Sequence, residues 1–160
     1  SPVEMGVDLL FVDGEDMGVP GKSNSYGLGT REFSKKIPRP FPRYAVCLDM
    51  VGDAIPEFKK EYFSIIQAPK IVERIWSIAG DLGFGEFKDM LGTPVYDDHR
   101  VLFEHTGIPS VDIIDFQYPD SKKNYWHTLD DTPDKCSAET LGMVGTVITH
   151  LIYLEGKSQY

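Results

Sequence analysis

Short apolar runs of strand length alternate along this chain with segments of helical periodicity. The runs at 7–12, 44–51 and 110–116 are almost continuously apolar, and residues 61–67 form a further strand candidate. Continuous apolar runs are typical of strands that are buried on both faces, as they are in parallel sheets. The alternation therefore predicts an α/β sandwich with a largely parallel sheet.

Three helices are predicted between and after these strands. Pro69 opens a segment with an apolar residue every three or four positions, and Gly83 is placed to end it. The two acids at 97–98 can cap a short helix that ends at Gly107. Ser137 caps a final helix, whose apolar stripe consists of Leu141, Val144, Ile148, Leu151 and Ile152.

Two loops separate these elements, and they have the composition of functional segments. Residues 18–30 are rich in Gly and Ser, which suits a lid or a substrate loop, and residues 117–136 form an unusually long polar connection. The first apolar run begins within the first ten residues, so we expect further strands of the same sheet before Ser1. The 160 residues, 41% of them apolar, suffice for one domain.

Charge and cysteine content exclude several classes of function. The chain has 25 acidic and 16 basic residues, and its net charge of −9 disfavours nucleic acid as a partner. We expect no membrane-spanning segment, because every apolar run is short. The two cysteines cannot form a disulfide framework. No signal peptide is visible, but a mature secreted chain would look the same.

Acids and one histidine stand where the predicted strands end. Glu15 and Asp16 follow the first run, and Asp49 lies near the end of the second. Asp97 opens the short helix, and the long polar loop carries His127. The carboxyl ends of parallel strands gather the chemistry of open α/β sheets, so these side chains could meet at one edge.

The residue types at this edge suit a zinc site. Of the neighbours Glu15 and Asp16, one carboxylate can bind the ion while the other stays free as a general base, and His127 would supply a nitrogen ligand. Ordinary roles remain open for each residue. Adjacent acids after a strand are often solvated turn residues, a histidine in a polar loop is often a surface residue, and the acids at 97–98 can simply cap a helix.

Five stretches give the chain a family resemblance. In order and context they resemble the M28 family of zinc-dependent peptidases, and within it the glutaminyl-peptide cyclotransferase (glutaminyl cyclase) branch. These stretches are LLFVDGED at 9–16, YAVCLDMVGD at 44–53, YFSIIQAPKIVERIWSIAGDLG at 62–83, YDDHRVLFEHTGIPSVDIID at 96–115 and YWHTLDDTPDK at 125–135.

The resemblance implies a role for each candidate residue. Glu15 matches the general acid/base of the family, and Asp16 and His127 match zinc ligands. Asp49 lies where the two-zinc peptidases bind their second metal and where the cyclases keep a hydrogen-bonding acid. Asp97 matches the cyclase aspartate that is linked to the catalytic glutamate. Since like charges this close cannot all be ionised, we expect a trapped proton among Glu15, Asp49 and Asp97.

Substrate contacts and a third zinc ligand are also implied. Trp126 matches a tryptophan that packs beside the substrate, and Tyr96 is assigned to substrate binding with it. The first metal-binding aspartate of the family would lie upstream of Ser1. The implied fold is a three-layer sandwich with a mostly parallel twisted sheet flanked by helices, of the phosphorylase/hydrolase-like zinc exopeptidase type. Residues 1–160 would be the C-terminal part of one such domain, without its N-terminal strands.

Three functions follow as alternatives. A cyclase would use one zinc ion to convert an N-terminal glutamine to pyroglutamate with release of ammonia. An M28 aminopeptidase would use two zinc ions to hydrolyse N-terminal residues. A metal-free fragment or binding module would instead pair its open sheet edge with the missing N-terminal part or with another chain. The enzymes take peptides with a free N-terminus, and the resemblance implies a secreted, periplasmic or cell-surface location.

Overall fold

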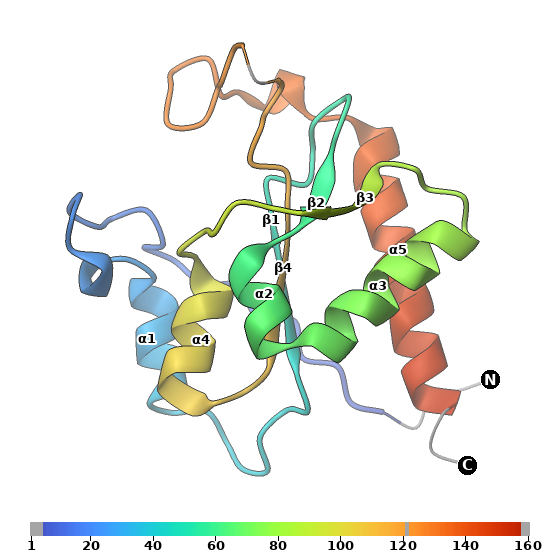
Figure 1. The fold of residues 1–160 in the computed structure, drawn as a ribbon. Coiled ribbons are helices and arrows are strands. Elements are labelled where there is room, and N and C mark those ends of the chain that lie inside the picture. Colours follow the sequence, from blue (N-terminus) through green and yellow to red (C-terminus); the bar gives the residue numbers. More distant parts are fainter. Residues whose placement is uncertain (1–4, 121, 158–160) are drawn as a thin grey trace.

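The computed structural model describes residues 5–120 and 122–157, which form an α/β fold (Figure 1). The helices are α1 (Leu28–Ser34), α2 (Tyr62–Gln67), α3 (Pro69–Asp81), α4 (Asp98–Thr106) and α5 (Ala138–Lys157). The strands are β1 (Ala45–Asp49), β2 (Phe58–Lys60), β3 (Phe87–Leu91) and β4 (Ser110–Ile114). Short 3₁₀ helices span Ser23–Ser25 and Pro133–Lys135.

The strands pair in parallel, as the sequence predicts. β1 pairs with β4 in a continuous register from Ala45 opposite Ser110 to Asp49 opposite Ile114, and β2 pairs with β3. In Figure 1, α1, α2 and α4 lie on one side of the β1–β4 pair, and α3 and α5 lie on the other. This arrangement of parallel strands between helices confirms the predicted fold class.

The two faces of β4 have different surroundings. Val111 and Ile113 join the main hydrophobic core, which they share with α3, α5 and the β2–β3 pair. Alternate side chains of a strand point to opposite faces, so Asp112 faces the other layer, where it meets His99 of α4. The core includes Phe58, Val72, Ile75, Trp76, Ile78, Ala79, Phe87, Val144, Val147 and Leu151.

The three predicted helices form with the expected caps. Pro69 is the first residue of α3, and Gly83 follows that helix with a φ of 81°. Asp97 is the N-cap of α4, and Gly107 ends it in the left-handed conformation. At the start of α5, the backbone N–H of Thr140 donates to Ser137 Oγ at 3.3 Å.

The prediction of a buried strand at 7–12 is wrong in this structure. The segment has no strand pairing, and its apolar side chains other than the half-buried Val12 are exposed, with Leu9 at 81% and Phe11 at 92%. A strand is stable only where a neighbouring strand satisfies its backbone N–H and C=O groups. None of the described strands lies beside residues 7–12, so the apolar pattern alone does not produce a strand.

The prediction of a strand at 61–67 is also wrong, because these residues form α2. Both carboxylate oxygens of Glu61 act as a helix cap, accepting hydrogen bonds from the backbone N–H of Phe63 at 2.9 Å and of Ser64 at 2.7 Å. The short strands β2 and β3 were not expected from the sequence, since β3 lies in a Gly-rich stretch that reads as irregular.

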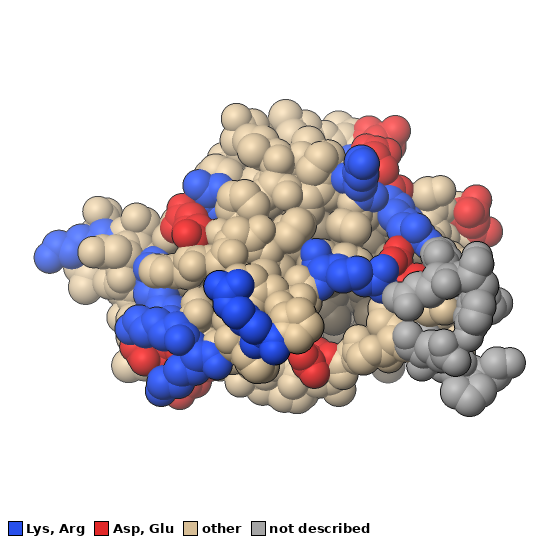
Figure 2. All heavy atoms as spheres, turned by 90° about the horizontal axis from the view of Figure 1, so that it is seen from below, with Lys and Arg blue, Asp and Glu red and all other residues tan. Residues whose placement is uncertain are grey.

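The end of the molecule below the strands carries many basic side chains. Figure 2 shows this face, on which Lys and Arg are spread among fewer Asp and Glu. The described residues of this end therefore do not contribute the excess of acidic side chains that gives the chain its net charge of −9. Among the described residues, no helix has the length and apolar character needed to cross a membrane.

Candidate active site

The loop that carries Glu15 and Asp16 is fixed by the first turn of α1. The backbone carbonyls of residues 13–15 accept hydrogen bonds from the amides of residues 27–29 at 2.9 to 3.3 Å. Gly29 permits this approach, because a Cβ there would lie 2.6 Å from the carbonyl oxygen of Asp13. The helix start thus uses its free N–H groups to hold the acidic loop.

Asp49 and Asp97 come to this region from two other elements. Asp49 is the last residue of β1, and Met50 turns the chain away with a positive φ of 48°. Asp97 is only 5% exposed, and its Oδ1 accepts a hydrogen bond from the backbone N–H of Asp98 at the start of α4. Strand β1 and the start of helix α4 therefore hold the backbones of Asp49 and Asp97 in place.

His127 joins the acidic loop from the far end of the sequence. Its Nε2 lies 2.9 Å from Oδ1 of Asp16. The backbone of His127 is left-handed, with a φ of 58°, and the ring of Trp126 stacks on its imidazole with centroids 3.9 Å apart. Phe116 packs against Trp126 in turn, at a centroid distance of 5.2 Å. A strained backbone and a stacked ring together fix the imidazole opposite Asp16.

The carboxylates raise one another's pKa values. Burial raises the pKa of Glu15 to about 8, and the hydrogen bond with Asp16 and the charges of Asp97 and Asp49 add to the shift. Burial also raises the pKa of Asp49 to about 6, with further contributions from Asp97 and Asp16. The structure thus brings Glu15, Asp16, Asp49 and Asp97 into one electrostatic group, and both shifts have the direction that a trapped proton requires.

The Asp16–His127 pair suits a zinc ion by its chemistry and by its spacing. A carboxylate oxygen and an imidazole nitrogen are both common zinc ligands, and two ligands of one tetrahedral zinc lie about 3.3 Å apart. The observed 2.9 Å between Asp16 Oδ1 and His127 Nε2 is close to that separation. Both side chains are open to solvent, at 63% and 45% exposure, so an ion can reach them.

The hydroxyl of Tyr96 contacts side chains of α1 and α4. It accepts a hydrogen bond from Arg31 at 2.9 Å and donates to Glu104 at 2.8 Å. The hydroxyl is therefore already engaged, and the assignment of Tyr96 to substrate binding stays a prediction. Trp126, by contrast, is 41% exposed beside His127.

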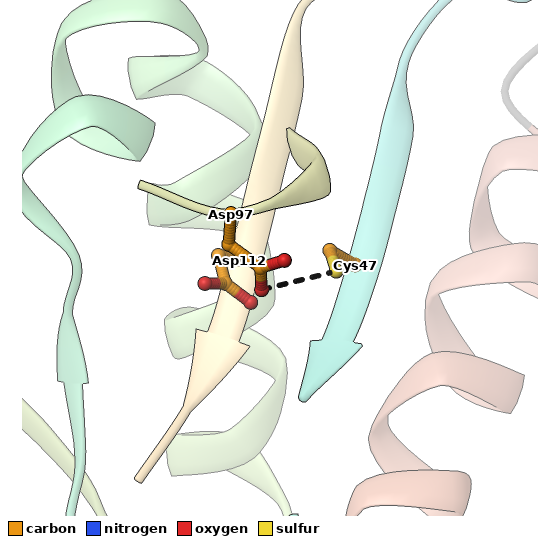
Figure 3. A group of neighbouring side chains, drawn as sticks. All are labelled: Cys47, Asp97 and Asp112. Atoms are coloured by element: carbon orange, nitrogen blue, oxygen red, sulfur yellow. Dashed lines mark hydrogen bonds between the residues drawn. The ribbon is translucent and has the colours of Figure 1, made fainter. Parts of the chain in front are cut away.

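A buried polar cluster below this group was not expected from the sequence. Cys47 Sγ and carboxylate oxygens of Asp97 and Asp112 all lie within 4.8 Å of one another, and Figure 3 shows the three side chains together. The thiol of Cys47 donates to Asp97 Oδ2 at 3.7 Å. The available signal was Asp112 itself, because an acid inside a continuously apolar strand has no ordinary structural role.

A second acid and a histidine extend this cluster inward. His99 Nε2 lies 3.1 Å from Glu61 Oε2, and His99 Nδ1 lies 3.5 Å from Asp112 Oδ2. All three side chains are at most 2% exposed. In the sequence, Glu61 was part of a predicted strand and His99 was only the third residue of an acidic helix start.

Comparison with known proteins gives a consistent family assignment. The sequence profile described as Peptidase family M28 matches residues 1–152. No curated protein sequence matches the chain. Among solved structures, a Zn-dependent exopeptidase from Parabacteroides distasonis is 36% identical with a TM-score of 0.82, over 89% of this chain and 52% of its own.

Two further solved structures carry different names. A glutaminyl cyclase from Bacteroides thetaiotaomicron, bound to N-acetylhistamine, is 32% identical with a TM-score of 0.82, over 89% of this chain and 52% of its own. A leucine aminopeptidase precursor from the same organism is also 32% identical, with a TM-score of 0.81, over 89% and 51%. This chain thus spans about half the length of these structures.

Proposed function

This chain belongs to peptidase family M28, and from that premise we propose that it is part of a zinc enzyme acting on the amino-terminal residue of peptides. The proposed activity is that of a glutaminyl cyclase, which closes an N-terminal glutamine to pyroglutamate and releases ammonia. Structures named as glutaminyl cyclases and as exopeptidases share its fold, and these names support an enzyme of this kind.

One observation carries the proposal: Glu15 stands beside the Asp16–His127 pair with its pKa raised to about 8, first by burial and then by its acidic neighbours. Asp16 and His127 would hold zinc, and Glu15 would stay unligated. A bound zinc ion supplies a Lewis acid that polarises the side-chain amide of the substrate. A carboxyl group whose pKa lies near neutrality can both accept and return a proton.

The chain's own residues then divide the work. Glu15 takes a proton from the attacking α-amine and passes it to the departing ammonia. The new bond joins the α-nitrogen to the side-chain carbonyl carbon, and the carbon–nitrogen bond of the amide breaks. Asp97 and Asp49 hold Glu15 in a partly protonated acidic group. Trp126, stacked on His127, would pack against the apolar stem of the glutamine.

An M28 aminopeptidase is the second candidate. In that case Glu15 would activate a water molecule, and Asp49 would become a ligand of a second zinc ion. The acidic neighbourhood of Asp49 and Asp16 supports this alternative, as does the similarity to a leucine aminopeptidase precursor. The number of zinc ions therefore differs between the two candidates, one for the cyclase and two for the aminopeptidase.

The products distinguish the candidates. The protein at its natural length is incubated with zinc and with peptides that begin with glutamine or with leucine. Ammonia released without free amino acid supports the cyclase, and free leucine or glutamine supports the aminopeptidase. If protein that contains stoichiometric zinc releases neither product, both candidates are contradicted, and a binding module remains as the function.

The completed site would include a part of the protein outside these 160 residues. Asp16 and His127 are two ligands, whereas catalytic zinc usually has three from the protein. The same missing part would cover the exposed apolar segment 7–12, of which Leu10, Phe11 and Val12 line a hollow together with Phe33 of α1. Residues 1–160 would then be the C-terminal part of one domain, in line with their coverage of about half of the solved relatives. We also place the activity outside the cytoplasm, since one relative is named as a precursor.

A further inference from the structure

A row of buried polar side chains leads inward from Asp97, and the proposed function assigns no role to it. Glu61, His99 and Asp112 are 1%, 2% and 0% exposed, and they follow one another at 3.1 and 3.5 Å. Buried polar groups are costly unless each donor and acceptor is paired. The hydrogen positions along this row can therefore be worked out from its fully paired end.

Glu61 is that end, and it is an ionised acceptor. Its oxygens accept from the backbone N–H of Phe63, Ser64 and Val95 and from Ser64 Oγ, at 2.7 to 3.0 Å. Burial raises the pKa of Glu61, but the hydrogen bonds from His99 and from the backbone outweigh it, so the pKa lies below its ordinary value. A carboxylate can only accept, so the Nε2 of His99 carries a proton and donates it to Glu61.

The other ring nitrogen of His99 faces Asp112. Nδ1 lies 3.5 Å from Asp112 Oδ2, and neither Nδ1 nor either carboxylate oxygen of Asp112 has a hydrogen-bond partner among the described residues. An ionised Asp112 would thus be fully buried without a single donor that satisfies it, unless His99 were doubly protonated. A neutral Asp112 beside a neutral imidazole avoids two buried charges.

The surroundings of Asp112 also favour its neutral form. Burial raises the pKa of Asp112 well above its usual value, and the nearby acids raise it further. The titratable groups that face it are Cys47 and Asp49 of β1, Glu61 before α2, and Asp97, Asp98 and His99 at the start of α4. His99 is the single base among these described groups, and its Nε2–H is already committed to Glu61.

We propose that Asp112 is a neutral carboxylic acid that faces Nδ1 of His99, and that its lack of charge lets Asp97 keep its place at the floor of the site. Figure 3 shows the side chains of Asp97 and Asp112 close together beside β4, and carboxylate oxygens of the two lie within 4.8 Å of one another. A charge on Asp112 would repel the carboxylate of Asp97 and displace it. Asp112 is thus a positioning residue, and its catalytic consequence rests on the proposed function.

The proton is tested directly by spectroscopy on the protein at its natural length. Glu15, whose pKa is raised to about 8, gives a protonated-carboxyl band of its own, so the infrared carbonyl band is recorded at neutral pH in Glu15→Gln protein. A band is expected there, and it should be lost when Asp112→Asn is added. Asp115→Asn is the matched control, because Asp115 is equally buried but its carboxylate accepts from the backbone N–H of Glu57 and of Gln117. A band that persists when Asp112→Asn is added to Glu15→Gln, or that is absent from Glu15→Gln itself, would overturn the proposal.

Stability supplies a second readout that does not depend on activity. A raised pKa in the folded state costs stability once the pH exceeds the ordinary value of an aspartate. Thermal unfolding of Asp112→Asn should therefore shift upward relative to the unchanged protein as the pH rises from 4 to 7. A downward shift over this range would mean that Asp112 is ionised against a charged His99, and it would contradict the proposal.

Enzyme kinetics then test whether Asp112 positions Asp97. Asp112→Ala should lower kcat on the order of tenfold with little change in KM, and Asp112→Asn should restore much of the loss because it keeps the size and a donor. Equal kcat for the unchanged protein and Asp112→Ala would refute the positioning role. If the unchanged protein has no activity but the infrared band that depends on Asp112 is present, then the proposed function fails while the neutral Asp112 stands.

Discussion

The imidazole of His127 and the carboxylate of Asp16 lie 2.9 Å apart although 111 positions separate them in the chain. Two far-apart loops meet at this point, one fixed by the start of α1 and the other by the stacking of Trp126 on His127. Glu15 stands next to Asp16 and shares its electrostatic surroundings. A zinc site at this place requires that contact between Asp16 and His127.

Glu15→Gln should abolish turnover while leaving zinc in place. The amide cannot take up the proton of the α-amine, so kcat is expected to fall by about 100-fold or more. Steady-state kinetics and zinc content, measured on the same sample, check this. Glu32→Gln, an identical change on exposed α1, is the control and should keep full activity. Full activity in Glu15→Gln would remove Glu15 from the mechanism.

His127→Ala and Asp16→Asn should each weaken zinc binding. Each variant removes one proposed ligand, and we expect the dissociation constant for zinc to rise by about 100-fold or more. Competition titration against a chromogenic chelator measures this. His150→Ala changes an exposed histidine on α5 and should bind zinc as the unchanged protein does. Equal affinities for all three variants would exclude Asp16 and His127 as ligands.

Glu61 should make stability depend on acid pH. Its folded pKa of about 2 lies below the ordinary value of 4.5, so its contribution is fully present above pH 4.5 and is lost as the pH falls toward 2. Glu61→Gln should therefore lower the free energy of unfolding by about 3 kcal/mol at pH 7, with a smaller difference at pH 3. Denaturant unfolding at both pH values measures it.

The control for that experiment is Glu139→Gln, on the exposed first turn of α5. Its loss should stay within about 0.5 kcal/mol at either pH. A loss in Glu61→Gln that is equally large at pH 3 and pH 7 would show that the carboxylate is not ionised in the folded protein.

Gly29→Ala should disturb the acidic loop. The added Cβ would lie 2.6 Å from the carbonyl oxygen of Asp13, and backbone cannot easily give way. The loop of residues 13–15 would shift, so kcat should fall by a larger factor than the equilibrium constant for folding does. Gly142→Ala on α5 is the matched control, since its Cβ meets nothing within 4 Å and alanine favours helix by about 0.5 to 1 kcal/mol. Equal activity in both variants would contradict the role given to Gly29.

Local sequence signals predicted those elements that local interactions build. The caps at Asp97, Gly107 and Ser137 and the apolar spacing of α3 lie within a few residues of what they control, and these elements form as expected. The segment 7–12 has the composition of a buried strand, but strand formation depends on a partner from elsewhere, and among the described residues none is beside it.

The short strands β2 and β3 and the helix α2 escaped prediction. Residues 61–67 are apolar enough for a strand, yet the side chain of Glu61 caps them into a helix. The candidate site residues could be named because each stands at the end of a strand or in a functional loop. The link between Asp112 and His99 could not be predicted, because it joins the middle of β4 to α4 and no spacing in the sequence encodes it.

Locating the zinc ion tests the central claim most directly. Crystals of the protein at its natural length, soaked in zinc, are measured at wavelengths on both sides of the zinc absorption edge. We predict an anomalous peak between Asp16 and His127, with Glu15 close by and unligated. A peak within the Cys47, Asp97 and Asp112 cluster, or no peak beside His127, would contradict the account.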